Sequence, residues 1–321
     1  MVQHGDVLSD IPYNTIEYSD FLRRYVMRSN SIMWFLGAGA SATAGIPTAW
    51  NMILEFKQLL YASKKRISVK CIGDLSNIDV CNKLERFAKE HGGLPEPGHP
   101  DEYAALFEAT YPSESDRQVY LDTKLKGAKP SYGHMALATL MKANRVRIVW
   151  TTNFDALIAD ACAKVFGSTG HLTTATLDAP NIAREAVTLE RWPLEIKIHG
   201  DFRSRRLKNT TDELREQDVM LRRLLVDSCD RSGLVIAGYS GRDESVMDTL
   251  LEALAKDIPF PNGLFWLHRG EDAPLEQVRD VLVAAKQKGV DGGLVNIENF
   301  DEVLRDLHST RLFFQSRDSG S

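Results

Sequence analysis

The first residues whose types and spacing could do chemistry form a glycine-rich segment behind an apolar run. Residues 32–36 are all apolar, and Gly37, Gly39 and Gly45 follow among small residues. Residues without bulk let the backbone approach a pyrophosphate, and the N–H groups of a helix N-terminus favour a bound anion. The dinucleotide fingerprint G-x-G-x-x-G is absent, because Ala42 stands where its third glycine belongs. The segment predicts either a phosphate site or a tight turn without a ligand.

Three further stretches place polar residues or glycines after apolar runs. Asn153 and Asp155 follow one run, His199 follows the next, and Gly238 and Ser240 follow a third. Each residue also has a structural reading, as a helix cap, a hydrogen-bonded core histidine or a turn glycine. Because open parallel sheets bind ligands at the carboxyl ends of their strands, we expect these stretches to share one edge of a sheet.

Short apolar runs alternate with helix-length segments along the chain, which predicts an α/β fold with a doubly wound parallel sheet, Rossmann-like. We expect residues 1–321 to form a single domain, with a helical insertion at about 64–129 beside the sheet and a flexible tail at about 315–321. The expected strands lie near 32–36, 146–151, 194–198, 234–237, 263–267 and 293–297, and the expected helices near 44–62, 131–144, 154–165, 212–228, 243–257, 274–288 and 301–313.

Composition limits the classes of binding partner and the cellular compartment that we expect. With 39 basic and 44 acidic residues, the net charge of −5 gives no global attraction for nucleic acid, so we expect no direct nucleic-acid binding. No apolar stretch reaches the roughly 18 residues of a membrane span, so we expect no membrane association. The four cysteines show no C-x-x-C spacing, which favours reduced thiols and a cytoplasmic protein.

Taken together, the four stretches resemble the sirtuin family. Sirtuins carry the pattern G-A-G-x-S-x-x-x-G-I-P, which residues 37–47 match at every fixed position. They carry T-Q-N-[ILF]-D, and residues 151–155 keep its asparagine and aspartate. Their catalytic histidine before glycine corresponds to His199, and their glycine-and-serine turn at the ribose corresponds to residues 238–240. The resemblance covers about residues 30–310 and implies a sirtuin-type NAD-binding core.

Two departures separate the chain from the deacetylase sirtuins. Residues 48–50 replace the D-F-R that follows G-I-P in those enzymes, and only Cys229 follows His199. A structural zinc site needs about four Cys or His ligands in close pairs. We therefore expect no zinc ribbon and no bound metal.

The sequence A-G-Y-S-G-R-D-E at residues 237–244 and the helical insertion are similar to the divergent sirtuin-like domains of bacterial anti-phage defence systems. That resemblance implies an NAD hydrolase (NADase) with NAD as its substrate, which releases nicotinamide and ADP-ribose and depletes the cell's NAD in abortive infection. It also implies a homo-oligomer or a defence-system sensor partner: an Argonaute-like protein, an ATPase or a fused sensor domain. Two alternatives stay open, an NAD-dependent protein deacylase or ADP-ribosyltransferase, and a non-catalytic nucleotide-sensing module.

The sirtuin correspondence implies catalytic roles for three residues. Asn153 holds a ribose hydroxyl and positions the attacking water, Asp155 binds the carboxamide of nicotinamide, and His199 is the general base, since imidazole titrates near neutral pH. Three further histidines have no such context and are expected to be structural or on the surface: His99, His134 and His171. The expected cofactor-binding residues are Gly37, Ala38, Gly39, Ala40, Ser41, Gly45, Pro47, Thr152, Phe154, Gly238, Tyr239, Ser240 and Asn296.

Overall fold

A computed structural model describes residues 12–90, 93–97, 99, 102–198, 211–270 and 272–318. The chain divides into two compact units. The first unit comprises Met1–Ala40, Pro130–Gly241 and Ser245–Ser321, and the second comprises Ser41–Lys129 and Arg242–Glu244.

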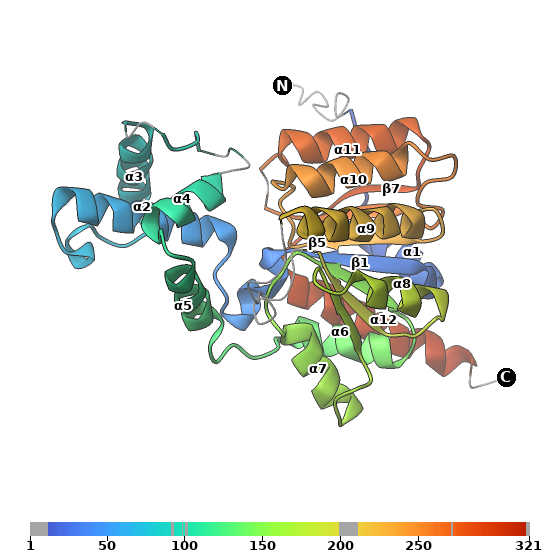
Figure 1. Cartoon of the computed structure of the whole chain (residues 1–321). Coiled ribbons are helices and arrows are strands. Elements are labelled where there is room, and N and C mark those ends of the chain that lie inside the picture. Colours follow the sequence, from blue (N-terminus) through green and yellow to red (C-terminus); the bar gives the residue numbers. More distant parts are fainter. Residues whose placement is uncertain are drawn as a thin grey trace, which may run out of the picture. The chain divides into compact units, whose positions relative to one another are not determined.

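The first unit is built on a sheet of seven strands in the order β3-β4-β2-β1-β5-β6-β7, within the described part of the chain (Figure 1). Every neighbouring pair is parallel. From β1 the chain builds one side of the sheet with β2, the edge strand β3 and then β4 between them, and at β5 it continues on the other side of β1. This order confirms the predicted doubly wound fold. The strands are β1 (Ile32–Leu36), β2 (Ile148–Thr151), β3 (Thr173–Thr176), β4 (Leu194–Lys197), β5 (Gly233–Ala237), β6 (Leu264–Arg269) and β7 (Gly292–Ile297).

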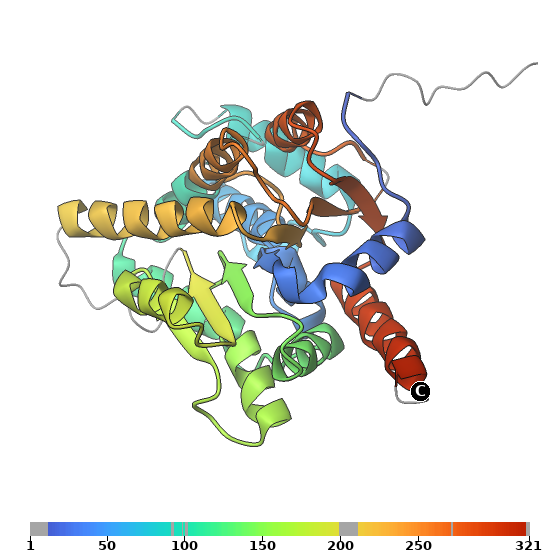
Figure 2. The same ribbon diagram turned by 90° about the vertical axis from the view of Figure 1, so that its right-hand side faces the viewer.

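Helices cover both faces of this sheet (Figures 1 and 2). One buried apolar cluster includes Trp150 and Trp266 and lies between the sheet and the helices α8 to α11. The opposite cluster includes Trp34 and lies under α1, α6, α7 and α12. Because both faces are covered, the central strands are mostly apolar, and β1 is apolar throughout. The helices are α1 (Tyr18–Arg28), α6 (Tyr132–Lys142), α7 (Leu157–Phe166), α8 (Pro180–Thr188), α9 (Thr211–Cys229), α10 (Glu244–Leu254), α11 (Glu276–Gln287) and α12 (Phe300–Asp318).

The edge strand β3 lies outside the sequence-based prediction. It pairs with β4, and of its four residues only Ala175 is buried. Threonine suits a half-buried pleated surface but gives no apolar run, so this strand carries little sequence signal.

The other edge of the sheet is covered by the segment that precedes α1. The Ile16 amide donates to the Leu294 carbonyl at 2.8 Å, and the Leu294 amide donates to the Asn14 carbonyl at 2.9 Å. These bonds occupy backbone groups that an edge strand would otherwise expose. Helix α1 then packs beside α12 (Figure 2), where the Tyr18 hydroxyl donates to Asp306 Oδ2 at 2.9 Å.

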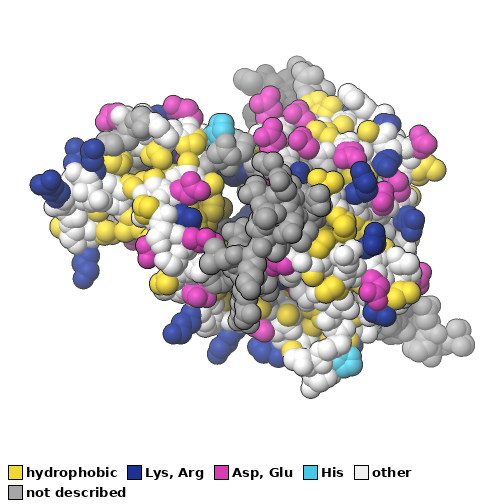
Figure 3. Space-filling view, viewed as in Figure 1, with side chains coloured by type: hydrophobic (Ala, Val, Ile, Leu, Met, Phe, Trp, Pro, Cys, Tyr) yellow, Lys and Arg dark blue, Asp and Glu magenta, His cyan; other side chains and the backbone are white. Residues whose placement is uncertain are grey.

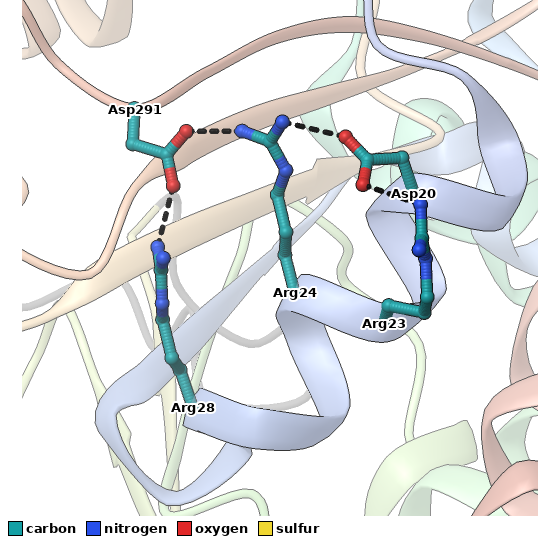
Figure 4. Close-up of polar contacts among 5 residues, drawn as sticks. All are labelled: Asp20, Arg23, Arg24, Arg28 and Asp291. Atoms are coloured by element: carbon teal, nitrogen blue, oxygen red, sulfur yellow. Dashed lines mark hydrogen bonds and ion pairs between the residues drawn. The ribbon is translucent and has the colours of Figure 1, made fainter.

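An ion-pair cluster fastens α1 to the start of β7 (Figure 4). Asp291 accepts from Arg24 and, at 2.5 Å, from Arg28. Arg24 also pairs with Asp20 at 2.5 Å, and Arg23 pairs with the same carboxylate at 3.0 Å. The Arg24 hydrogen bond lowers the pKa of Asp20. These side chains are partly exposed, so each pair contributes only modestly to stability.

The second unit is helical, with α2 (Ala49–Lys65), α3 (Ile78–Glu90), α4 (Glu102–Thr110) and α5 (Glu114–Leu125). Its core is an aromatic cluster in which Phe56 stacks on Phe107 with ring centroids 4.9 Å apart. The buried Lys57 Nζ lies 2.6 Å from a carboxylate oxygen of Glu85 and 2.6 Å from one of Glu102.

The helix expected from residue 44 begins later. A 3-10 helix covers Ala38–Ala44, Gly45 has a left-handed φ of +85°, and the α-helix starts at Ala49. Thr48 caps α2, since its side chain accepts from the Asn51 amide and its own amide donates to Asn51 Oδ1 at 3.1 Å. Gly45 and this cap interrupt the regular helix that small residues alone would favour.

The surface carries mixed charge. On the face drawn in Figure 3, Lys and Arg side chains of the described residues are interspersed with Asp and Glu. Among the helices that the structure describes, none combines the length and the apolar character needed to cross a membrane.

Candidate active site

The carboxyl ends of the parallel strands define one edge of the sheet in the first unit. Because all strands run the same way, the residue that follows each member of a paired row lies at this edge. Gly37, Thr152, Gly238 and Asn296 each follow a member of that row. The row, in spatial order, is Thr176, Lys197, Thr151, Leu36, Ala237, Leu267 and Val295.

The predicted site residues are not equally close along this edge. Gly37 follows β1, while Thr152 and Gly238 follow its two direct neighbours, β2 and β5. Asn296 is exposed at the end of β7, three strands from β1, or about 14 Å at the usual strand spacing. The structure therefore brings the first three together at the switch point of the sheet and leaves Asn296 apart.

The glycines after β1 pack against the turn after β5. The Gly37 amide donates to the Ala237 carbonyl at 3.0 Å, and the Gly39 amide donates to the Gly238 carbonyl at 2.8 Å. A Cβ on Gly37 would lie 2.6 Å from the Gly238 oxygen, and a Cβ on Gly238 would lie 2.2 Å from the Ala40 nitrogen. Contact between the two turns therefore requires glycine at these positions, whether or not a phosphate binds.

Two backbone N–H groups of the predicted cofactor-binding segment are hydrogen-bonded within the protein. The Gly39 amide bonds to Gly238, and the Ala40 amide donates to the Gly37 carbonyl at 3.0 Å. The segment is a 3-10 helix rather than the N-terminus of an α-helix, and only the Ala40 bond of these two lies within the segment. Three other predicted cofactor residues belong to the second unit: Ser41, Gly45 and Pro47.

Asn153 is fixed at the junction of β1 and β2. Its amide nitrogen Nδ2 donates to the Gly37 carbonyl at 3.1 Å, and its backbone amide donates to Thr151 Oγ1 at 2.9 Å. Thr151 Oγ1 in turn donates to the Leu36 carbonyl at 3.0 Å, and the Thr152 amide donates to the same carbonyl at 3.2 Å. The glycine turn thus orients the Asn153 side chain.

Asp155 begins the connection to α7. Its Oδ1 accepts from the Leu157 amide, the first N–H of that helix, at 3.0 Å. The N-cap position itself is Ala156, which makes no side-chain capping bond, so Asp155 satisfies one amide at the start of α7 without being its N-cap. A role in binding a carboxamide stays a prediction, as does the role of the neighbouring Phe154.

His134 lies close enough to Asp155 for the carboxylate to act on its charge. The histidine is 2% exposed, and its Nδ1 is 2.8 Å from Ser131 Oγ, which donates to Asp301 Oδ1 at 2.6 Å. Because the single hydroxyl proton goes to Asp301, Nδ1 of His134 is the donor to Ser131. Burial lowers the pKa of His134, against the opposing effects of Asp155 and Asp301. This neutral, hydrogen-bonded histidine fits the structural role expected of it.

Lys197 is a residue that the sequence-based set omits. It is 1% exposed at the end of β4, and its Nζ donates to the Asp155 carbonyl at 2.5 Å. The sequence did carry one sign of this residue. A lysine is seldom buried unless it is paired, so a lysine within a short apolar run indicates a side chain with a specific partner.

The turn after β5 is anchored in the core. The Tyr239 ring lies edge-on to Phe35 with centroids 5.0 Å apart and tilts against Trp266 at 6.0 Å. Ser240 is exposed beside it. The cofactor-binding roles of Tyr239 and Ser240 stay predictions.

The predicted general base His199 lies outside the described residues. In the described ranges, no group of three or more His, Cys, Asp or Glu side chains could hold a metal ion. All four cysteines are free thiols, and burial raises the pKa of Cys162 to about 12.

Part of the chain is similar in sequence to known proteins. Residues 147–291 match the sequence model of the family described as SIR2-like domain. "Defense-associated sirtuin 2" of Bacillus subtilis is 25% identical over 193 residues, which cover 60% of this chain and 15% of that protein. The chain therefore matches only a small part of its curated relative.

Solved structures with sirtuin titles also match the chain at low sequence identity. The structure titled "Structural Basis for the Mechanism and Regulation of Sir2 Enzymes" is 14% identical with a TM-score of 0.44, covering 92% of this chain and 99% of that chain. A "Sir2 homolog-NAD complex" is 14% identical with a TM-score of 0.41, covering 90% and 94%.

Proposed function

We propose that this chain, which contains a divergent sirtuin-like domain, is an NAD hydrolase that releases nicotinamide and ADP-ribose. The proposal depends above all on the junction of β1, β2 and β5. There Asn153 is hydrogen-bonded to Gly37, and the turn that begins at Gly37 packs on Gly238. These are the residues through which the sequence resembles sirtuins, and they meet where open parallel sheets bind ligands.

The reaction replaces one bond at the ribose carbon C1′. The bond to the ring nitrogen of nicotinamide breaks, and nicotinamide leaves with the bonding electrons as a neutral molecule. Water forms the new C–O bond at C1′ and gives its proton to His199 as general base. The fixed amide of Asn153 would hold a ribose hydroxyl and the water in line, which supplies orientation before the bond breaks.

Two hydrogen bonds of described residues support these roles. The Ile198 amide donates to the Thr151 carbonyl at 3.0 Å, so the last described residue before His199 is paired with β2, the strand that precedes Asn153. The hydrogen bond from the Leu157 amide orients the carboxylate of Asp155, which would bind the carboxamide of the departing nicotinamide.

We infer that the activity serves bacterial anti-phage defence by depleting NAD. The support is the similarity to a protein named a defence-associated sirtuin, together with the sequence of residues 237–244. An uncontrolled NAD hydrolase would poison its own cell. The activity would therefore be gated by homo-oligomerisation or by a sensor partner.

An NAD-dependent protein deacylase or ADP-ribosyltransferase is the second candidate. The four cysteines lack the close pairs that build the zinc lobe of deacetylase sirtuins, which favours the hydrolase. Nicotinamide release that requires an added acyl-lysine peptide would support the second candidate instead. Stoichiometric NAD binding with no turnover under activating conditions would support a sensing module.

The test measures nicotinamide release and calorimetric NAD binding, under the condition or with the partner that activates the wild type. Asn153→Ala should lower release at least tenfold, while its matched control Asn181→Ala, at an exposed position on α8, should not. His199→Ala should lower release by about a hundredfold or more, as expected for the loss of a positioned base, and should keep NAD affinity. Undiminished release by either site variant would contradict the assignment of that residue.

A further inference from the structure

The strand β4 carries two buried charged side chains in an otherwise apolar run. Leu194 and Ile196 face the cluster under α8 to α11, so alternation turns Glu195 and Lys197 to the opposite face of the sheet. Both charged residues are 1% exposed. Burying a charged side chain costs free energy unless hydrogen bonds compensate, so the contacts of a buried charge show which groups it holds in place.

The contacts of Lys197 point to the segment that carries the proposed site. Its Nζ donates to the Asp155 carbonyl at 2.5 Å and lies 3.5 Å from the Phe154 carbonyl. Lys197 pairs in register with Thr151, the last residue of β2, so its side chain crosses to the chain that continues from the neighbouring strand.

That segment has no regular structure of its own. Between Thr151 and Leu157 the chain belongs to neither strand nor helix. Its beginning is held by the contacts of Asn153 to Thr151 and Gly37, and its end by the hydrogen bond from the Leu157 amide to the Asp155 carboxylate. Lys197 holds the backbone between these two points.

We propose that Lys197 is a positioning residue that fixes residues 153–155 for catalysis. Its long side chain lets β4 hold the carbonyl of Asp155, and with it the angle between the Asn153 amide and the Asp155 carboxylate. Small changes in this angle lower the rate of catalysis, because the reacting groups must be held close to their productive geometry. The inference rests on the proposed hydrolysis for its kinetic consequence, but its structural part stands without it.

The perturbation is Lys197→Met, which keeps the length and apolar stem and removes the donor. Lys164→Met, at an exposed position on α7, is the matched control. Lys197→Gln, which keeps an N–H donor on a shorter stem, is the second variant. Circular dichroism and thermal unfolding establish that each variant folds.

The first readout is amide hydrogen exchange of the peptide that covers residues 152–158, measured by mass spectrometry on the full chain. Lys197→Met should raise exchange in this peptide and leave the peptides of β1 and β5 unchanged, and Lys197→Gln should restore part of the protection. Unchanged exchange in Lys197→Met would overturn the proposal. So would failure of both variants to fold, because Lys197 would then support the core as a whole.

The second readout is nicotinamide release by the activated protein. Lys197→Met should lower kcat at least tenfold with a smaller change in KM, and the control should match the wild type. A wild type that never hydrolyses NAD would contradict the proposed function, while the exchange result would still decide the role of Lys197. An active wild type with an equally active Lys197→Met would contradict the positioning role alone.

Discussion

Replacing Gly238 by alanine tests whether the turns after β1 and β5 are in contact. The added Cβ would lie 2.2 Å from the Ala40 nitrogen and 2.7 Å from the Gly39 carbonyl carbon. Both are backbone atoms, which cannot rotate away as the end of a side chain could. Gly238 also has a left-handed φ of +65°, which an alanine tolerates poorly.

The two costs can be separated with a matched glycine. Gly167 has a φ of +84°, and a Cβ there would meet nothing within 4 Å. Gly167→Ala should therefore cost only the conformational strain, about 1–2 kcal/mol. Gly238→Ala should cost that strain plus about 1–3 kcal/mol for the forced shift of a packed neighbour, or about 2–5 kcal/mol in all.

Urea unfolding followed by tryptophan fluorescence measures both variants, since Trp34, Trp150 and Trp266 are buried in the unit that carries the turns. Gly238→Ala should also weaken NAD binding in calorimetry, because the displaced turn carries the proposed site. Gly167→Ala should bind NAD like the wild type. Equal losses of stability in the two variants would refute the contact between the turns.

Three further predictions concern pH, a buried charge and metal. Burial lowers the pKa of His134, so the unfolded chain takes up a proton before the folded chain does and stability falls as the pH drops below about 6.5. The slope of the unfolding free energy against pH below about 6.5, measured by urea unfolding, should fall by up to about 1.4 kcal/mol per pH unit in His134→Gln. An unchanged slope would contradict the lowered pKa. Lys57→Met should lower the free energy of unfolding by about 3–5 kcal/mol, because it leaves two carboxylates without the ammonium between them. A loss no larger than that of the exposed control Lys64→Met would argue against a buried ion pair. Elemental analysis of the purified chain should find well under one zinc ion per protein. A tightly held, stoichiometric zinc ion would contradict the prediction, made from the missing cysteine pairs, that the chain has no zinc ribbon.

The alternation of apolar runs and helices was sufficient to predict the parallel sheet and the edge where its loops meet. Buried parallel strands are apolar on both faces, so runs such as residues 32–36 stand out in the sequence. The edge strand β3 did not stand out, because its threonines are half buried and form no apolar run.

The contacts within the site could not be predicted in the same way. The glycine pattern at residues 37–39 is typical of a phosphate turn, yet the tightest neighbour of these glycines is Gly238, which lies far along the chain. Local patterns describe which residues a turn can accommodate and say little about which distant loop packs against it. Lys197 was missed for the same reason, since its role depends on a carbonyl that follows another strand.

The most direct test of the central claim combines NAD calorimetry with product analysis on the full chain under activating conditions. The account predicts that NAD binds, that Asn153→Ala weakens turnover more than its control Asn181→Ala, and that nicotinamide and ADP-ribose appear in equal amounts without any acyl peptide. Absence of NAD binding by the wild type, or nicotinamide release only when an acyl peptide is present, would contradict it.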